Sequence, residues 1–164
     1  MKLARKNGKV KIGLNTRLNH VGYLVKDISA AAGLFVQRLG YVVESAVVED
    51  KLQTAFVQFL RLPGDTAWLE LVTPSSANSK LANTLHKGAG LHHICYETTD
   101  FEALCATLRD QAMFMVGNPA PAEAFANRRI AWFMDRSRFL VEIVESGRGA
   151  FSVFHDLSGR EKTS

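Results

Sequence analysis

Two histidines and two glutamates occupy matching positions in two similar halves of this 164-residue sequence. The segment LNHVGY, which contains His20, is repeated as LHHICY, which contains His93. Each is followed by a glutamate in an apolar run: Glu70 lies 50 residues after His20, and Glu142 lies 49 residues after His93. Imidazole and carboxylate groups together suit zinc, cobalt, manganese, nickel or iron, and the pattern does not choose among these ions. The repeat therefore predicts one divalent metal ion bound by both halves.

The surroundings of the glutamates favour a nearby cation. Alternation along a strand places Trp68, Glu70 and Val72 on one face, and Glu142 has similar apolar neighbours in the second half. A carboxylate among bulky apolar side chains is costly to bury unless a positive charge compensates it. A histidine on a strand is more often a hydrogen-bonded core residue than a ligand, but the matched pair with matched glutamates favours metal binding.

Strand alternation also predicts which of two adjacent histidines is the ligand. His92 and His93 should point to opposite faces of their strand. The repeat places His93 in the position of His20, so His93 is the predicted ligand.

The elements that position these residues form the same series in each half. Residues 18–75 predict a β-α-β-β-β module with strands at 18–25, 41–48, 54–60 and 67–72 and a helix at 28–39. Asp27 is a suitable N-cap for this helix, and Gly40 is placed to end it.

The second module covers residues 90–146 and repeats the series. It predicts strands at 91–98, 114–116, 129–134 and 139–144, with a helix starting near Asp100. A connector at 76–89 contains a short helix, residues 1–17 form a basic extension, and residues 147–164 form a polar tail. The loop at 118–127 is long enough to border a binding site.

Composition excludes several classes of function. The chain has a formal net charge of +4, but six basic residues and no acidic ones fall within residues 1–17, so the remainder is slightly acidic. We therefore expect no nucleic-acid partner. No apolar run has the length of a membrane span or a secretory signal, and the two cysteines are too few for a disulfide framework. These features predict a cytoplasmic protein without a membrane partner.

The sequence resembles the vicinal-oxygen-chelate superfamily, which includes glyoxalase I, extradiol dioxygenases, fosfomycin-resistance proteins and methylmalonyl-CoA epimerase. The likeness is greatest to the epimerase branch, and it rests on the opening strand and helix, on LELVTP at 69–74, on GLHHI at 90–94 and on LVEI at 140–143. The resemblance implies an α+β fold in which two βαβββ modules pair into a curved, open, barrel-like sheet around a metal site. It also implies a homodimer, and the metal ligands His20, Glu70, His93 and Glu142.

The sequence departs from the epimerase branch at several positions. The glycine-rich loop of that branch is replaced by EAFANRRI at 123–130, and its His-Pro-Lys tripeptide is replaced by Met134-Asp135-Arg136. Some epimerases carry a glutamate proposed as a base at the strand position of Thr54, where this chain has none, although Glu49 matches a commonly acidic position. The sequence therefore leaves open whether the substrate is methylmalonyl-CoA or another compound.

The chemistry implied is proton transfer next to a carbonyl group. A metal ion stabilises the enolate that forms when a base removes the α proton, and the candidate bases are Glu142, Glu70 and Glu49. Arg128 and Arg129 would bind phosphates of a CoA-like tail, or they are ordinary charges at a strand edge. The predicted function is a metal-dependent epimerase or isomerase acting on a small molecule such as a 2-substituted acyl thioester.

Three alternatives remain open. The first is a glyoxalase I-like lyase acting on a thiol adduct. The second is a dioxygenase, which usually has two histidines and a single carboxylate around iron, so that Glu70 counts against it. The third is a non-enzymatic protein that binds a small molecule, as in antibiotic resistance.

Overall fold

The computed structural model describes residues 15–147, and these form one mixed, open sheet of ten strands with three α-helices. The strands are β1 (Thr16–Leu24), β2 (Val42–Val43), β3 (Val48–Asp50), β4 (Ala55–Arg61), β5 (Trp68–Pro74), β6 (Gly90–Thr98), β7 (Phe114–Met115), β8 (Ala120–Ala122), β9 (Arg128–Met134) and β10 (Leu140–Glu145). The helices are α1 (Ile28–Leu39), α2 (Ala82–Lys87), α3 (Phe101–Asp110) and a short 3₁₀ turn, η1 (Glu123–Phe125). The α+β class and the paired βαβββ arrangement are thus confirmed.

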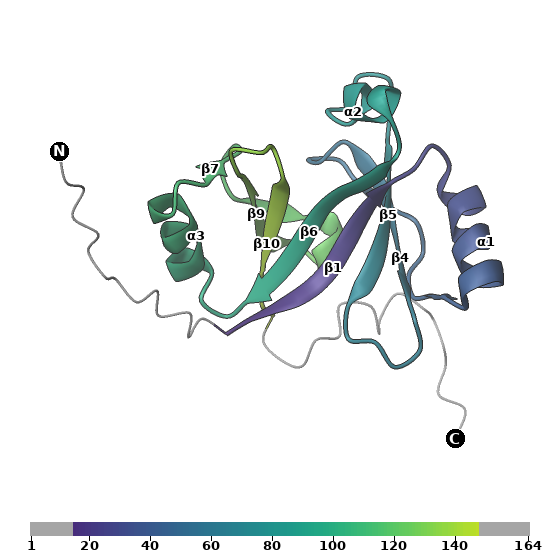
Figure 1. The fold of residues 1–164 in the computed structure, drawn as a ribbon, viewed down its shortest axis with the longest axis horizontal. Coiled ribbons are helices and arrows are strands. Elements are labelled where there is room, and N and C mark those ends of the chain that lie inside the picture. Colours follow the sequence, from purple (N-terminus) through teal and green to yellow (C-terminus); the bar gives the residue numbers. More distant parts are fainter. Residues whose placement is uncertain (1–14, 148–164) are drawn as a thin grey trace.

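The strand order is symmetric about its centre, as a duplication requires. The order is β2-β4-β5-β1-β6-β10-β9-β7, with β3 paired to β4 and β8 paired to β9. Strands β1 and β6, which open the two modules, pair antiparallel in the middle, and each has a parallel neighbour from its own module. Figure 1 shows this central pair, with α1 and α3 at opposite ends of the molecule.

The two faces of the sheet have different partners. Helix α1 packs on β4 and β5, and α3 packs on β9 and β10. The opposite face carries a shared apolar cluster drawn from both modules, which includes Phe59, Val72, Phe125, Ile130 and Val144. Alternation along β5 sends Leu69 and Leu71 toward the α1 side, so the residue between them, Glu70, points toward the shared face.

Local signals in the sequence explain where α1 begins and ends. The Asp27 side chain accepts a hydrogen bond of 2.8 Å from the backbone N–H of Ala30, as expected for an N-cap. Gly40 ends the helix in the left-handed conformation, with φ of 76°. Both predicted boundaries are confirmed.

One predicted strand differs in the structure. The strand expected at 41–48 is split into β2 and β3, because the Ser45 hydroxyl accepts the hydrogen bond of the Phe59 backbone N–H in place of a strand carbonyl. The loop expected at 118–127 contains β8 and η1.

The basic extension predicted for residues 1–17 lies outside the described residues except for its last three, of which two begin β1. The predicted tail at 147–164 lies outside them except for Gly147. Within residues 15–147, no helix has the length and apolar character needed to cross a membrane.

Candidate metal centre

The four predicted ligands come together on the shared face of the sheet. His20 and His93 lie on the central strands β1 and β6, and Glu70 and Glu142 lie on the flanking strands β5 and β10. The register is the same in both halves: Gly22, two residues after His20, pairs with Glu70, and Cys95, two residues after His93, pairs with Glu142. The same strand pairing in both halves therefore places one imidazole and one carboxylate from each half at the cluster.

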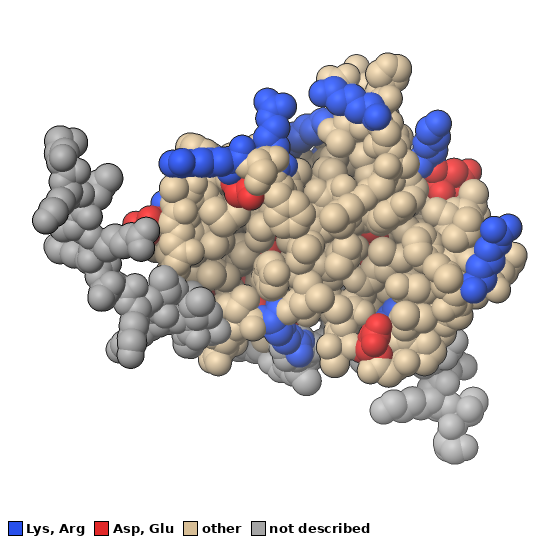
Figure 2. Space-filling model, in the orientation of Figure 1, with Lys and Arg blue, Asp and Glu red and all other residues tan. Residues whose placement is uncertain are grey.

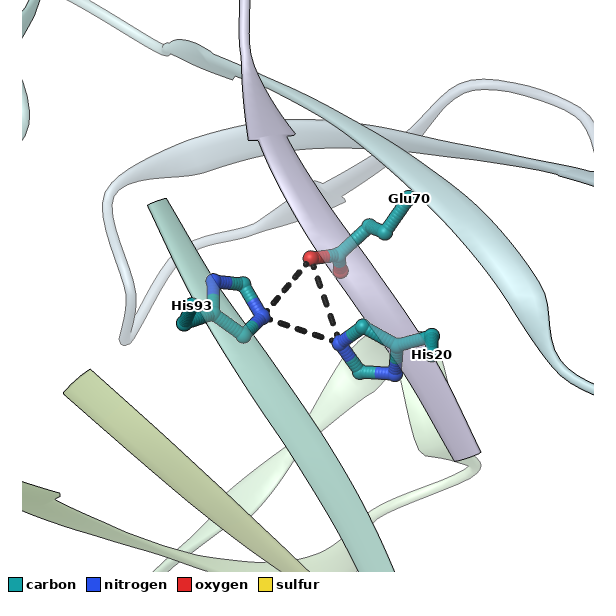
Figure 3. Close-up of side chains that lie close together, drawn as sticks. All are labelled: His20, Glu70 and His93. Carbon is teal, nitrogen blue, oxygen red and sulfur yellow. Dashed lines mark hydrogen bonds and ion pairs between the residues drawn. The ribbon is translucent and has the colours of Figure 1, made fainter. Parts of the chain in front are cut away.

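The distances among the four side chains are short. The two imidazole Nε2 atoms are 2.9 Å apart, and Glu70 Oε2 lies 3.4 Å from His20 Nε2 and 3.3 Å from His93 Nε2 (Figure 3). Glu142 Oε2 lies 3.2 Å and 3.6 Å from the same two nitrogens. Neighbouring ligand atoms that each lie roughly 2.1 Å from one ion are roughly 3.0 to 3.4 Å apart in octahedral or tetrahedral geometry. The residues present therefore fit a single divalent ion.

Burial makes a counter-charge necessary. His20, Glu70, His93 and Glu142 are each at most 5% exposed. Burial alone would lower the pKa of His20, but Glu70 and Glu142 outweigh it and raise that pKa to about 9. Burial would raise the pKa of Glu70, but His20 and His93 lower it to about 2, and they also lower the pKa of Glu142. Without a metal ion the cluster is thus held by protonated imidazoles facing carboxylates.

Cys95 is a further donor beside the cluster. Its thiol, His20 and Glu142 form a second group of potential ligand atoms that all lie within 4.8 Å of one another. Burial and the neighbouring carboxylate of Glu142 raise the pKa of Cys95 well above its usual value. The protein therefore keeps this thiol protonated, and the carboxylates are the better ligands.

His92 does not point away from His93, and the prediction based on strand alternation is wrong here. The β1–β6 register pairs Gly22 with His93 and then Tyr23 with Leu91, so His92 is an extra residue in a β-bulge. The bulge turns His92 to the same side, where its Nδ1 atom lies 2.8 Å from His93 Nδ1.

Three members of the cluster, Glu70, His93 and Glu142, line a cavity of about 480 Å³, whereas His20 is fully buried and is not among the lining residues. The lining is mainly apolar and comes from both modules, including residues of the 118–127 loop, which confirms that this loop borders the pocket. Its polar members include Asp50, Glu70, His92, His93 and Glu142. This size and composition are typical of small-molecule sites.

Glu49, a predicted base, is exposed and does not line the cavity. Its neighbour Asp50 is buried and does line it, because consecutive residues of β3 point to opposite faces. Sequence reasoning missed Asp50, although the same alternation argument, applied to this strand, could have identified it. The structure does not test Glu49 as a base, but its exposed position makes Asp50 the better candidate on β3.

A family model described as the glyoxalase/bleomycin resistance protein/dioxygenase superfamily matches residues 19–132. The chain belongs to this superfamily. The resemblance inferred from the sequence is thereby confirmed.

Relatives within the glyoxalase superfamily include two epimerases. The ethylmalonyl-CoA/methylmalonyl-CoA epimerase of Cereibacter sphaeroides is 35% identical over 107 residues, which cover 64% of this chain and 78% of the relative. The human mitochondrial methylmalonyl-CoA epimerase is 35% identical over 97 residues, which cover 57% of this chain and about half (52%) of the human protein.

Solved structures of the glyoxalase superfamily share the fold. Methylmalonyl-CoA epimerase from Mycobacterium tuberculosis superposes with a TM-score of 0.68 at 29% identity, covering 79% of this chain and 87% of that chain. A variant of the Streptomyces coelicolor methylmalonyl-CoA epimerase, in complex with 2-nitronate-propionyl-CoA, gives a TM-score of 0.71 at 25% identity over 82% of this chain and 99% of that chain.

The two predicted phosphate-binding arginines are engaged elsewhere in this member of the superfamily. Arg128 donates to the buried carboxylate of Glu97 at 3.0 Å. Arg129 is partly exposed and bridges Glu102 and Glu145. Neither arginine lines the cavity of the described structure, so their binding to phosphates stays a prediction.

The stability of the metal-free protein should peak near pH 6.5. Below that value, burial and His93 lower the pKa of His92 from 6.5 to about 4, so the folded state binds fewer protons than the unfolded state and stability rises with pH. Above that value the opposite holds. The pKa of His20 is raised from 6.5 to about 9 in the folded state, so its stabilising contribution is fully present below pH 6.5 and is lost as the pH rises through about 9. We expect the melting temperature of metal-free protein to fall by about 5 °C or more between pH 6.5 and 9.

Thermal melts of metal-free and metal-loaded protein across pH 5 to 9 measure this effect. A bound ion requires neutral imidazoles, so the fall above pH 6.5 should disappear in the loaded protein. The variant His20→Gln should show a smaller fall, because the pKa of His93 is raised by the same two carboxylates, whereas His86→Gln, which alters an exposed histidine, should keep the full effect. A metal-free melting temperature that stays constant or rises from pH 6.5 to 9 contradicts the charge assignment.

Proposed function

We propose that this protein is a metal-dependent epimerase that removes and returns the proton α to the carbonyl group of a 2-substituted acyl-CoA thioester. The observation that carries the proposal is the cluster of two histidines and two glutamates, three of which (Glu70, His93 and Glu142) line a mostly apolar cavity. The 35% identity to the Cereibacter sphaeroides epimerase supports the choice of reaction, because that relative is named for two such acyl-CoA substrates.

His20, Glu70, His93 and Glu142 would hold the divalent ion. The ion would supply a Lewis acid that stabilises negative charge on the thioester oxygen when the α proton is lost. Zinc, cobalt, manganese, nickel and iron all suit this set of nitrogen and oxygen donors. Such a ligand set distinguishes the proposal from a binding protein without catalysis, which has no need of buried carboxylates beside the ligand.

Epimerisation requires a proton-transfer group on each face of the α carbon. Glu142 enters the cavity from the second module and Asp50 from the first. The pKa of Glu142 is lowered, so it is ionised and able to accept a proton. Asp50 is placed to return the proton from the other side: burial raises its pKa, although its two carboxylate oxygens accept hydrogen bonds from the backbone N–H groups of Gln53 and Glu123, which lower it. We assign proton removal to Glu142 and proton return to Asp50 in one direction of the reaction.

Other cavity residues suit an anionic, polar ligand. Lys80 is exposed and lines the cavity. In Figure 2 separate Lys and Arg side chains are spaced along the upper edge of the molecule, on which α2 lies. The indole Nε1 of Trp132 is buried without a hydrogen-bond partner among the described residues, and this side chain also lines the cavity. It can donate to a substrate oxygen at low cost, because no existing bond must be broken.

Deuterium exchange tests the proposed reaction. Protein loaded with each candidate metal is incubated in deuterium oxide with methylmalonyl-CoA, ethylmalonyl-CoA and propionyl-CoA, and the α deuterium is measured by mass spectrometry. We expect exchange into the 2-carboxylated thioesters and loss of exchange after treatment with a chelator. A parallel reaction with methylglyoxal and glutathione reports lyase activity. Thioester formation there, without exchange into any acyl-CoA, would replace the epimerase assignment by the lyase alternative.

A further inference from the structure

The residue before each predicted ligand histidine is turned inward by a β-bulge. The β1–β6 register pairs Leu18 with Tyr96 and then His20 with Cys95, so Asn19 is an extra residue, as His92 is in the second half. A regular strand would direct Asn19 to the face opposite His20. In the structure Asn19 is 1% exposed and contacts the His20 ring. Both halves therefore place a polar side chain against the Nδ1 atom of the ligand histidine.

The hydrogen bonds of Asn19 determine how its amide is oriented. Its Nδ2 atom donates to Glu97 Oε2 at 2.9 Å. Arg17 and Arg128 also donate to this carboxylate, so Glu97 acts as the acceptor and the NH₂ group must face it. The Oδ1 atom then faces His20 Nδ1 at 2.9 Å and can only accept. His20 must therefore carry a proton on Nδ1. In the neutral imidazole that a metal ion requires, the lone pair is then on Nε2, the atom that faces Glu70 and Glu142.

Glu97 is itself held from several strands. It is 2% exposed, and its Oε1 atom accepts hydrogen bonds of 3.0 Å from Arg128 on β9 and 3.0 Å from Ser146 after β10. Arg17 on β1 approaches its Oε2 atom at 3.5 Å. A buried carboxylate that accepts hydrogen bonds from these donors is held in one position.

We propose that Asn19 and Glu97 form a positioning relay that sets the tautomer and the ring orientation of His20 for metal binding. The inference rests on the metal centre of the proposed function, and it assigns a task to Arg128 and Glu97, which do not line the cavity. Partners that bind the second nitrogen of a ligand histidine typically contribute a factor of roughly 10 to 100 in metal affinity. His92 holds the corresponding place beside His93.

Metal affinity in relay variants tests the proposal. The zinc dissociation constant is measured by competition with a chromophoric chelator for wild type, Asn19→Leu and Glu97→Gln. In Glu97→Gln the new NH₂ group can itself donate to Asn19. The Asn19 amide can then turn over, and its oxygen no longer has to face His20 Nδ1. We expect each variant to bind zinc roughly 10 to 100 times more weakly than wild type. Glu44→Gln is the matched control, because Glu44 also pairs with an arginine, Arg61, but lies in the first module away from the histidines.

A double variant separates positioning from simple support of the fold. N19D/E97Q exchanges carboxylate and amide between the two positions, so an oxygen again faces His20 Nδ1 and a donor again bridges the pair. Zinc affinity should return to within about threefold of wild type. Nitrogen-15 spectra of zinc-loaded protein should show the ring proton of His20 on Nδ1 in the wild type and in the double variant.

The outcomes distinguish the relay from the metal centre. Wild-type protein that binds no divalent ion overturns both. Zinc binding by wild type with unchanged affinity in Glu97→Gln, or a double variant no better than the single one, overturns the relay alone. Should Asn19→Leu fail to fold, Glu97→Gln and the double variant still decide the question.

Discussion

Replacing Gly22 by alanine is expected to abolish tight metal binding. A Cβ atom at this position would lie 2.0 Å from Cε1 and 2.3 Å from Nδ1 of His93, far inside van der Waals contact. Gly22 is paired with His93 across the central strands, so the imidazole lies directly over the glycine backbone. The ring would have to move by more than an ångström, which removes its Nε2 atom from the cluster. We expect divalent-metal affinity to fall by at least about 100-fold, measured by chelator competition.

Gly33→Ala provides the control for this experiment. Gly33 lies in α1, and nothing lies within 4 Å of the position that its Cβ would take. Alanine there should leave metal affinity unchanged and raise the free energy of unfolding by roughly 0.5 to 1 kcal/mol. Retention of wild-type affinity in Gly22→Ala would mean that His93 is not a ligand in the orientation described.

Glu142→Gln should nearly eliminate proton exchange while leaving the metal in place. The amide oxygen can still contact the ion, but the side chain can no longer accept a proton. We expect α-deuterium exchange into the preferred acyl-CoA to fall by roughly 10²- to 10⁴-fold, the usual contribution of a general base. The measurement combines exchange rates with elemental analysis of the same preparation, so that loss of metal is not mistaken for loss of the base.

Two further substitutions complete the comparison. Glu102→Gln alters a surface glutamate paired with Arg129 and should exchange at the wild-type rate. Asp50→Asn and Glu49→Gln compare the buried and exposed acids of β3, and only the former should slow epimerisation. Full turnover by Glu142→Gln would remove this residue as the base and leave Glu70 as the next candidate.

The repeat in the sequence was sufficient to predict that four side chains converge, because both halves keep the same strand register and the same alternation of side chains. His20, Glu70, His93 and Glu142 converge as expected, and the same series of elements appears in both halves. The strand boundaries near Ser45 could not be predicted, since a side-chain hydroxyl replaces a strand carbonyl there.

The inward positions of Asn19 and His92 have one physical cause. A β-bulge adds one residue to a strand and reverses the alternation on which face assignments rest. Nothing in the residue types at Asn19 or His92 marks a bulge, so the inward direction of both side chains emerged only from the strand register. The role of Arg128 was equally hidden, because its partner Glu97 lies 31 residues earlier in the chain.

Equal contributions from the two modules also bear on how such a centre could arise. A peptide equivalent to one module carries one imidazole and one carboxylate, and it could complete the ligand set only by associating with a second copy. Fusion of two copies makes that encounter intramolecular and therefore independent of protein concentration. Once joined, the copies were free to diverge at equivalent places, and Asn19 and His92, like Gly22 and Cys95, are such diverged pairs.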